Sequence, residues 1–358
     1  ALPFYRKASD RQVARALATV GSATDDYARR CMELMPSCSD VRNLQSAYPG
    51  IFENPVSALV SSPNRRSQSS IFRCLVCSTP LPPRSFALLP EGYLIPIPAL
   101  TVANLARELP PLQLAECASE LCSAYRKDPR DPRGMHDRSP VLDIAGLRDY
   151  LNRTSGVTGS KAARRVAPFI VEASASPMET TLALLLCLPK QKGGMGLPKP
   201  EMNARITIPP NLRRLAKRGY VRADLLWRRQ KVLVEYDSDW AHANTRSLNA
   251  DAAKRNVLQR MGYTVITLTK DQVNEWGAFW EFASIVSHAL RRGQGRDLGD
   301  WTNQQVRLWA SRGCGTDCPE LPFSADDAPS PRLPQPSLLQ EPAQSAGSYA
   351  FLHKPVDC

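Results

Sequence analysis

The sequence predicts an α/β protein, and three observations predict it. Between residues 174 and 292, helical and strand periodicities alternate in the order helix, three strands, helix, strand. Residues 1–125 combine helical patterns with short proline-broken strands, which indicates an α+β accessory region, and residues 126–173 indicate a helical connector. Prolines crowd the chain over residues 293–358, where we expect a disordered tail. The length of 358 residues is that of about two domains.

The first elements of the chain are helical. Val13, Leu17 and Val20 share one stripe, which predicts a helix over residues 10–34. Apolar runs bounded by turn residues then predict strands, and helical spacing predicts four helices before residue 174. The expected strands cover 71–77, 86–89 and 93–95, and the expected helices cover 102–109, 112–125, 141–151 and 161–173.

The domain that follows begins with a clear helix start. Ser176 is suited to the N-cap, Pro177 to the first turn, and Glu179 to the capping-box position three residues after the serine. The helix should continue over 180–188 and stop at the glycines that follow. The expected strands then cover 204–208, 220–227, 231–237 and 264–269, with a basic helical turn at 212–218 and helices at 248–261 and 271–291.

The spacing of carboxylates in two of these strands is the strongest functional signal. If residues 228–231 close a hairpin centred between Arg229 and Gln230, Asp224 and Glu235 fall opposite one another on one face of the sheet. Asp237 follows two residues further along that face. Carboxylates gathered in this way repel unless a cation lies among them, and oxygen ligands suit a hard divalent ion. The sequence therefore predicts a magnesium site on this hairpin.

A basic segment flanks the acidic one. The chain has a formal net charge of +12, which favours a polyanionic partner. Cations beside a metal site suit a phosphodiester substrate, whereas the simpler interpretation is a solvated basic face. The candidate phosphate contacts in the segment are Arg213, Arg214, Arg218, Arg228 and Arg229.

Residues 174–292 resemble the PD-(D/E)XK restriction-endonuclease-like superfamily. The resemblance is carried by the element order, by an aspartate on the second strand and by the Glu-x-Asp of Glu235-Tyr236-Asp237 on the third. Within it, the chain looks most like bacterial domains of unknown function related to the very-short-patch mismatch repair endonucleases. The resemblance implies a restriction-endonuclease-like core, α-β-β-β-α-β, and says nothing about the first 170 residues.

Further positions extend the match, and two depart from it. Relatives place a histidine after the third strand, an Asp and an Arg four residues apart in the next helix, and a glycine before the last strand. The matching positions are His242, Asp251, Arg255, Gly262 and the strand at 264–269. Ser238 stands where glycine is usual, and Asp237 replaces the lysine of the superfamily's Glu-x-Lys. Water activation would then depend on the metal, on His242 or on a base from the next helix such as Lys254.

The resemblance also implies residue roles. Asp224, Glu235 and the backbone carbonyl of Tyr236 would hold Mg²⁺ or Mn²⁺, which polarises the scissile phosphate and activates water. Asp237 would be a further ligand, and His242 a general acid or base. Two further residues would assist: Arg255 would neutralise the phosphate, and Glu179 would stand near the metal.

Each candidate has a simpler explanation. Glu235 would form a salt bridge to an arginine, Asp237 would cap a turn, and Glu179 is already explained by its capping box. Asp251 and Arg255 would form a surface ion pair on a helix. The remaining candidates are His242 as a surface or packed histidine, and Trp227 and Trp240 as core residues instead of base-stacking ones.

Three functional hypotheses follow. The first is a metal-dependent endonuclease or nickase, with magnesium as cofactor, that hydrolyses phosphodiester bonds of DNA, with RNA left open as substrate. The second is a non-catalytic nucleic-acid-binding or antitoxin-like regulatory protein that retains the nuclease fold. The third is a module that binds an acidic protein through its basic face. The N-terminal region could bind a protein partner in any of them.

Cysteine usage and hydropathy bear on the compartment. The ten cysteines lack the dense spacing of a disulfide scaffold, so reduced thiols in the cytoplasm are expected. Cys74 and Cys77, or Cys314 and Cys318, would each supply half of a zinc site. No signal peptide precedes the first helix, and the longest apolar run, 182–188, is too short to cross a bilayer. We therefore expect no membrane association.

Overall fold

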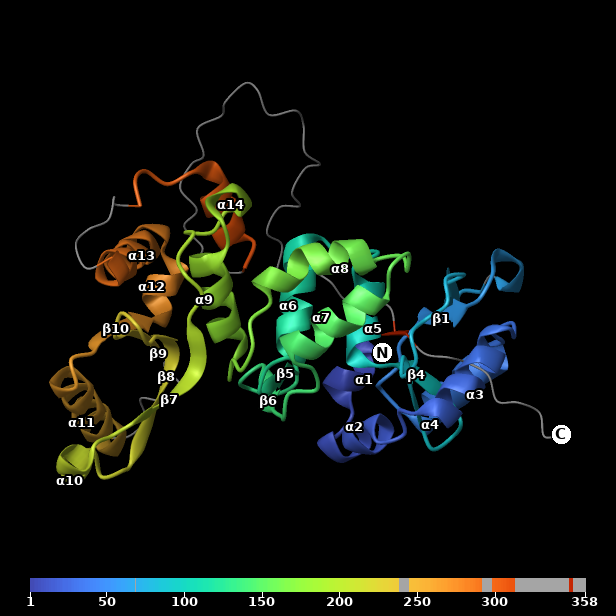
Figure 1. Ribbon diagram of the computed structural model, residues 1–358, viewed down its shortest axis with the longest axis horizontal. Coiled ribbons are helices and arrows are strands. Elements are labelled where there is room, and N and C mark those ends of the chain that lie inside the picture. The colour runs from blue at the N-terminus through green and yellow to red at the C-terminus, as the bar shows by residue number, and fades with distance from the viewer. Residues whose placement is uncertain (68, 238–244, 292–297, 313–347, 350–358) are drawn as a thin grey trace, which may run out of the picture. The chain divides into compact units, whose positions relative to one another are not determined.

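The computed structural model divides the chain into two compact units, each described here by itself (Figure 1). Unit 1 comprises Ala1–Glu172 and Pro334–Cys358, and unit 2 comprises Ala173–Leu333. The residues that the structure describes are 1–67, 69–237, 245–291, 298–312 and 348–349. The predicted connector over 126–173 thus has its contacts with the N-terminal region.

The N-terminal helical region of unit 1 consists of four helices where the sequence predicted one. The prediction of a continuous helix over residues 10–34 is wrong, because the chain leaves helical geometry at Gly21, which has a fully extended backbone. A capping box between Ser9 and Gln12 starts the helix before this break. The four helices are α1 (Leu2–Lys7), α2 (Asp10–Leu17), α3 (Ser22–Met32) and α4 (Cys38–Ala47).

The strands of unit 1 form small sheets. β1 (Val56–Val60), which the sequence analysis missed, is buried along its whole length and pairs in parallel with β2 (Phe72–Val76). β11 (Ser348–Tyr349) pairs in parallel with the other side of β1, so the sheet order is β11-β1-β2. The remaining strands form two antiparallel pairs: β3 (Phe86–Leu88) with β4 (Leu94–Pro96), and β5 (Tyr125–Lys127) with β6 (Met135–Asp137).

Four helices pack together in the rest of unit 1, near their predicted places, but the last ends at Val166 and not at the predicted residue 173. They are α5 (Pro98–Leu105), α6 (Pro111–Leu121), α7 (Ile144–Arg153) and α8 (Ser160–Val166). All residues of α5 are buried. Gly159 precedes α8 with a φ of +91°, and a Cβ there would lie 2.0 Å from the carbonyl oxygen of Ala103 in α5. Only glycine therefore allows α8 to begin this close to α5.

Unit 2 has the predicted order of elements. The helix α9 (Pro177–Cys187) precedes the strands, and the short helix α10 (Arg213–Ala216) lies between the first two. The predicted last helix divides in two, because the carboxylate of Glu275 accepts the N–H groups of Gly277 and Ala278 and starts a new helix. The remaining elements are β7 (Glu201–Thr207), β8 (Tyr220–Trp227), β9 (Val232–Asp237), α11 (Thr245–Arg260), β10 (Thr264–Thr269), α12 (Lys270–Asn274) and α13 (Trp276–Arg291).

These strands form one mixed sheet in the order β10-β9-β8-β7. β10 runs parallel to β9 after the crossover through α11, and the other neighbours are antiparallel. Leu226 lies opposite Leu233, and Trp227 opposite Val232. This register centres the β8–β9 hairpin between Arg229 and Gln230, which confirms the predicted pairing.

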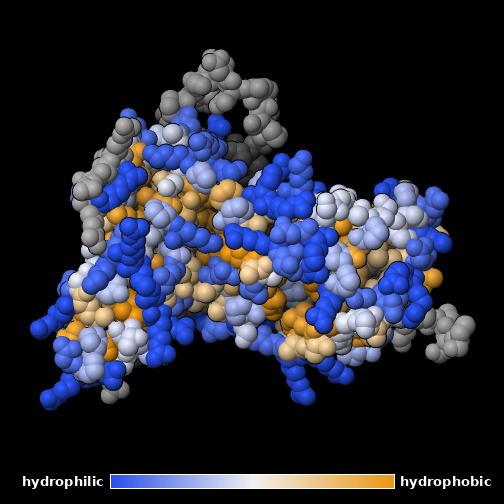
Figure 2. All heavy atoms as spheres, viewed as in Figure 1, coloured by the Kyte–Doolittle hydropathy of each residue, from blue (hydrophilic) through white to orange (hydrophobic). Residues whose placement is uncertain are grey.

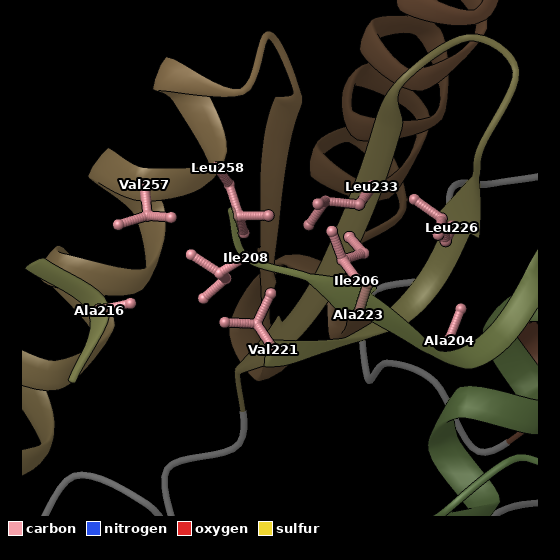
Figure 3. Close-up of a cluster of buried hydrophobic side chains, with 10 residues drawn as sticks. All are labelled: Ala204, Ile206, Ile208, Ala216, Val221, Ala223, Leu226, Leu233, Val257 and Leu258. Atoms are coloured by element: carbon pink, nitrogen blue, oxygen red, sulfur yellow. The ribbon is translucent and has the colours of Figure 1, made fainter. Parts of the chain in front are cut away.

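A hydrophobic cluster packs against the strands of this sheet and against α11. Alternate residues of β7 and β8, Ala204, Ile206, Val221 and Ala223 among them, are buried, and their neighbours in sequence are largely open to solvent. In Figure 3 the side chains of Ile208, Val221 and Leu258 of α11 converge. The alternation follows from the period of two in a strand, so the opposite face of β7 and β8 is the open one.

The prediction of a disordered tail from residue 293 is wrong for the segment around α14 (Asn303–Ala310). A capping box between Thr302 and Gln305 starts this helix. Trp309 is fully buried, lies 5.5 Å from the ring of Trp276, and donates from its indole nitrogen to the carbonyl of Val273. The segment is therefore part of the core of unit 2.

Hydrophilic side chains cover most of the surface that Figure 2 shows, with apolar residues in separate patches. Across the described parts of the chain, we find no helix with both the length and the apolar character needed to traverse a bilayer.

Candidate functional site

Four polar residues occupy one row across the sheet of unit 2. Glu235 of β9 is paired with Thr267 of β10. The pairs Leu225↔Val234 and Met202↔Leu225 adjoin this row, so continuing the two registers places Asp224 beside Glu235 on one side and Asn203 on the other. The row therefore reads Asn203, Asp224, Glu235, Thr267, one residue from each strand; we call it the polar row.

The backbone hydrogen bonding between β8 and β9 stops at this row. The backbone pairing of β8 with β9 ends at Leu225, and the backbone N–H of Tyr236 donates instead to Oδ2 of Asp224, 2.8 Å away. The N–H and C=O of one strand residue point to the same edge of the strand, so the carbonyl of Tyr236 also faces β8. Asp224 and the carbonyl of Tyr236 are thus brought to the same part of the hairpin.

Glu179 of α9 joins the row through Asn203. Ser176 caps α9 as predicted, because its hydroxyl accepts the N–H of Glu179. The Glu179 carboxylate, however, accepts the N–H of Ala175 at 2.8 Å and not the N–H of the cap itself, so the predicted reciprocal capping box is only half formed. Its Oε2 also accepts from the Asn203 amide at 2.5 Å. Capping does not fully account for this carboxylate.

The backbone of Asn203 explains how this contact arises. Its φ of +48° lies in the left-handed region, in the middle of β7, where asparagine is tolerated better than most residues. Its amide nitrogen donates to both Glu179 and the carbonyl of Ala173. Asn203 therefore connects the segment before α9 to the polar row.

Burial raises the pKa of two carboxyl groups here. Glu179 is 7% exposed, and burial together with the negative charge of Asp224 raises its pKa to about 7. Burial also raises the pKa of Asp224, while the hydrogen bond from Tyr236 and the charge of Lys254 act in the opposite direction. The two acids are close enough to affect each other, with a cation from another helix nearby.

Lys254 of α11 supplies that cation. Its Nζ lies 2.5 Å from Oε2 of Glu235, and both side chains are about four-fifths buried, with exposed fractions of 23% and 21%. Lys254 thus pairs with the carboxylate of β9 and acts electrostatically on that of β8. Arg255, the next residue, donates to Oγ1 of Thr267 at 3.3 Å, at the β10 end of the polar row.

The predicted catalytic residues divide into three groups. Asp224, Glu235, the backbone of Tyr236 and Glu179 come together. Asp237 ends β9, opposite Thr269 and two residues beyond the polar row. His242 and the side chain of Asp251 lie outside the described residues.

The possible metal ligands at the polar row have the chemistry of a divalent-cation site, but they are not gathered around one point. Across the described ranges, no group of three or more His, Cys, Asp or Glu side chains is placed to hold one metal ion. All the donors at the row are oxygens, which suit a hard ion such as Mg²⁺. The raised pKa of Glu179 beside Asp224 also marks a place where a cation would relieve repulsion. The residues present therefore have the ligand atoms that such an ion prefers. One of them, the carboxylate of Glu235, is paired with Lys254 in this structure.

The predicted phosphate contacts differ in their surroundings. Arg213, Arg214, Arg218 and Arg229 are exposed. Arg228 makes a two-pronged ion pair with Glu201 of β7, with Nη2 to Oε2 at 2.6 Å and Nε to Oε1 at 3.0 Å. A phosphate would have to compete with that carboxylate for Arg228.

The other candidates have ordinary structural roles where the structure describes them. Trp227 is 3% exposed and donates to the carbonyl of Pro198, so it is a core residue. Cys77 is buried, which raises its pKa, and its Sγ donates to the carbonyl of Thr79. No disulfide joins the described cysteines, and Cys314 and Cys318 lie outside the described residues.

Sequence reasoning missed Asn203 and gave Lys254 only a secondary place. An asparagine within an otherwise alternating strand is a signal for left-handed backbone. Lys254 gave a weaker signal, since a lysine on a helix is usually a solvated residue. Comparisons of the chain with models of protein families, with characterised proteins and with solved structures find no match.

Proposed function

We propose that unit 2 is a Mg²⁺-dependent endonuclease or nickase of the PD-(D/E)XK type that hydrolyses phosphodiester bonds of DNA. The observation that carries the proposal is the polar row, where Asp224 and Glu235 adjoin on two strands and helices on either side of them in sequence add Glu179 and Lys254. Carboxylates and a lysine at one point of a hairpin are the groups that phosphodiester hydrolysis requires. The element order of the unit agrees with this class.

Asp224, Glu235 and the carbonyl of Tyr236 would hold the metal, with Mn²⁺ as a substitute for Mg²⁺. When bound, the ion supplies charge to the scissile phosphate and lowers the pKa of water. The bond between the Tyr236 N–H and Asp224 fixes one carboxylate before any ligand arrives, which reduces the cost of ordering the site. Asp237, at the end of β9, and His242, which lies outside the described residues, remain further candidates.

Lys254 would take the place of the lysine that Asp237 replaces in the Glu-x-Lys motif. Its ammonium group already lies at the carboxylate of Glu235, so it would be available to contact a phosphate oxygen of the substrate. Arg255, held at Thr267, would add a second cation on the same helix. The exposed arginines Arg213, Arg214, Arg218 and Arg229 would attract the DNA backbone without sequence preference.

A second function has an observation in its favour. The ammonium of Lys254 occupies the position of a cation at Glu235 and neutralises that carboxylate without any metal. The alternative is a non-catalytic nucleic-acid-binding or antitoxin-like regulatory protein in which Lys254 neutralises the former metal site.

A plasmid-nicking assay separates the two. The full chain would be incubated with supercoiled DNA and either Mg²⁺ or EDTA, alongside Asp224→Asn and Glu235→Gln. Glu281→Gln, which neutralises an exposed carboxylate on α13, is the matched control. Metal-dependent nicking that only the first two changes abolish supports the endonuclease. DNA binding that persists without nicking, in the native chain and in every variant, contradicts it and supports the regulatory protein.

A further inference from the structure

We propose that the open face of β7 and β8 binds an unpaired nucleic-acid strand and leads it to the polar row. The inference deepens the proposed function and rests on it for the identity of the reaction, since it names the form of the substrate. The surface consists of Arg205 and Thr207 of β7 with Tyr220 and Arg222 of β8, and we call it the strand track.

The burial of alternate residues defines the strand track. In β8, Tyr220 and Arg222 are exposed, whereas Val221 and Ala223 are buried in the hydrophobic cluster. In β7, Arg205 and Thr207 are exposed by the same alternation. The four residues therefore share one open face, opposite the buried side chains of Ile206, Val221 and Ala223.

The positive charges on the strand track favour the binding of an anion. Arg205 and Arg222 are directly opposite one another on the antiparallel strands, and like charges in that position destabilise a sheet. Both side chains are exposed, and neither has an acidic partner closer than 4.0 Å among the described residues. A phosphate between the two guanidinium groups would turn the repulsion into two charge-assisted hydrogen bonds.

An aromatic ring lies next to these arginines. The side chain of Tyr220 is 39% exposed, which is unusual for so large a group. The guanidinium carbon of Arg205 lies 3.9 Å from the centre of the Tyr220 ring, so the arginine is stacked on one face of it. A cation therefore lies directly beside an exposed aromatic ring, the combination that sites for unpaired strands use for phosphate and base.

The track is continuous with the carboxylates. Asp224 follows Arg222 by two residues on β8, and Asn203 precedes Arg205 by two on β7, so each strand passes from the basic residues to the polar row within about 7 Å. A phosphate held at Arg222 would therefore put a neighbouring phosphodiester close to Asp224. The arginines of the track position the strand, and the polar row would act on it.

The chemistry favours an unpaired strand over a duplex. A base can stack on Tyr220 only if one of its faces is uncovered, and within a duplex both faces are covered by neighbouring base pairs. Stacking and phosphate contacts do not depend on base identity. Binding should therefore be salt-sensitive and tolerant of sequence.

The test measures binding separately from cutting. Fluorescence anisotropy in EDTA would follow the full chain binding to a labelled 20-nucleotide single-stranded DNA, to an RNA of the same sequence and to the corresponding DNA duplex. The variants are Tyr220→Ala, Tyr220→Phe and Arg222→Ala. Arg29→Ala is the matched control, because it removes an exposed arginine from α3 in unit 1. Circular dichroism would establish that every variant is folded.

We expect single-stranded DNA or RNA to bind more tightly than the duplex. Tyr220→Ala and Arg222→Ala should each weaken that binding by roughly tenfold, whereas Tyr220→Phe keeps the ring and Arg29→Ala changes little. Which of the two single strands binds better identifies the sugar. Equal binding by Tyr220→Ala and the native chain, or a preference for the duplex, would overturn the strand track. Absence of nicking with these binding results intact would overturn only the endonuclease.

Discussion

The backbone N–H of Tyr236 and the carboxylate of Asp224 are joined by a hydrogen bond of 2.8 Å across the β8–β9 hairpin. The side chain of Asp224 thereby accepts a hydrogen bond from a backbone N–H that would otherwise pair with a backbone carbonyl. The bond anchors Asp224 beside Glu235 and brings it into the electric field of Glu179. The consequences of this arrangement can be measured without knowing the substrate.

Glu179→Gln should reduce the pH dependence of the stability of unit 2. The pKa of Glu179 is raised from 4.5 to about 7, so the folded state binds more protons than the unfolded state between these values. The stabilisation by the neutral carboxyl group is fully present below pH 4.5 and is lost as pH rises through 7. The native chain should lose roughly 3 kcal/mol over this window relative to the variant.

Urea denaturation followed by tryptophan fluorescence measures this effect, because all six tryptophans of the chain lie in unit 2. Glu281→Gln serves as the control and should follow the native curve. If the native chain and Glu179→Gln kept a constant difference in the free energy of unfolding from pH 4.5 to 7, the raised pKa of Glu179 would be disproved.

A double-mutant cycle on Lys254 and Glu235 should give a coupling energy of about 1 to 2 kcal/mol. Lys254→Met or Glu235→Gln alone leaves a largely buried charge without its partner, whereas the double variant removes both charges. The free energy of unfolding of the four proteins, from urea titrations at pH 8, provides the cycle. Purely additive effects would mean that the ion pair does not hold α11 to β9.

Gly159→Ala should destabilise unit 1 by more than about 3 kcal/mol. A methyl group at this position has both an unfavourable φ of +91° and a contact of 2.0 Å with the carbonyl oxygen of Ala103. Gly134→Ala is the matched control, since its φ is +69° and nothing lies within 4 Å of the added Cβ. The control should cost only about 1 to 2 kcal/mol. Circular dichroism melts of the two variants would check the difference, and equal losses would contradict the close approach of α8 to α5.

Trp309→Ala should lower the free energy of unfolding of unit 2 by about 3 to 5 kcal/mol, because it empties a fully buried site and removes the bond to Val273. Trp301→Ala provides the comparison, since Trp301 is 37% exposed and contacts Trp276 at its edge. That change should cost about 1 kcal/mol. Urea titrations monitored by circular dichroism measure the free energy of unfolding of both variants. A negligible effect of Trp309→Ala would mean that α14 is not part of the core of unit 2.

The sequence predicted the hairpin register because it depends only on alternation and on a short turn. The spacing of Asp224 and Glu235 alone therefore predicts that they lie opposite one another. The approach of Glu179 and Lys254 could not be predicted in the same way, since it depends on how α9 and α11 pack. The left-handed turn of Asn203 redirects a side chain in mid-strand, which no periodic pattern describes.

Errors elsewhere have similar local causes. Gly21 interrupts an apolar stripe that continues beyond it, so spacing alone joined two helices into one. The charged segment after residue 125 lacked apolar alternation and concealed the β5–β6 hairpin, which is held by backbone pairing. α14 stands next to a proline-rich stretch, and that composition masked a short helix with few apolar residues.

The insertion of Trp309 beside Trp276 has a practical consequence for dissecting the molecule. A fragment cut at residue 292, where the proposed nuclease domain ends, would expose several aromatic rings and promote aggregation during purification. Biochemists who wish to isolate the second unit should therefore let the polypeptide run to at least residue 312.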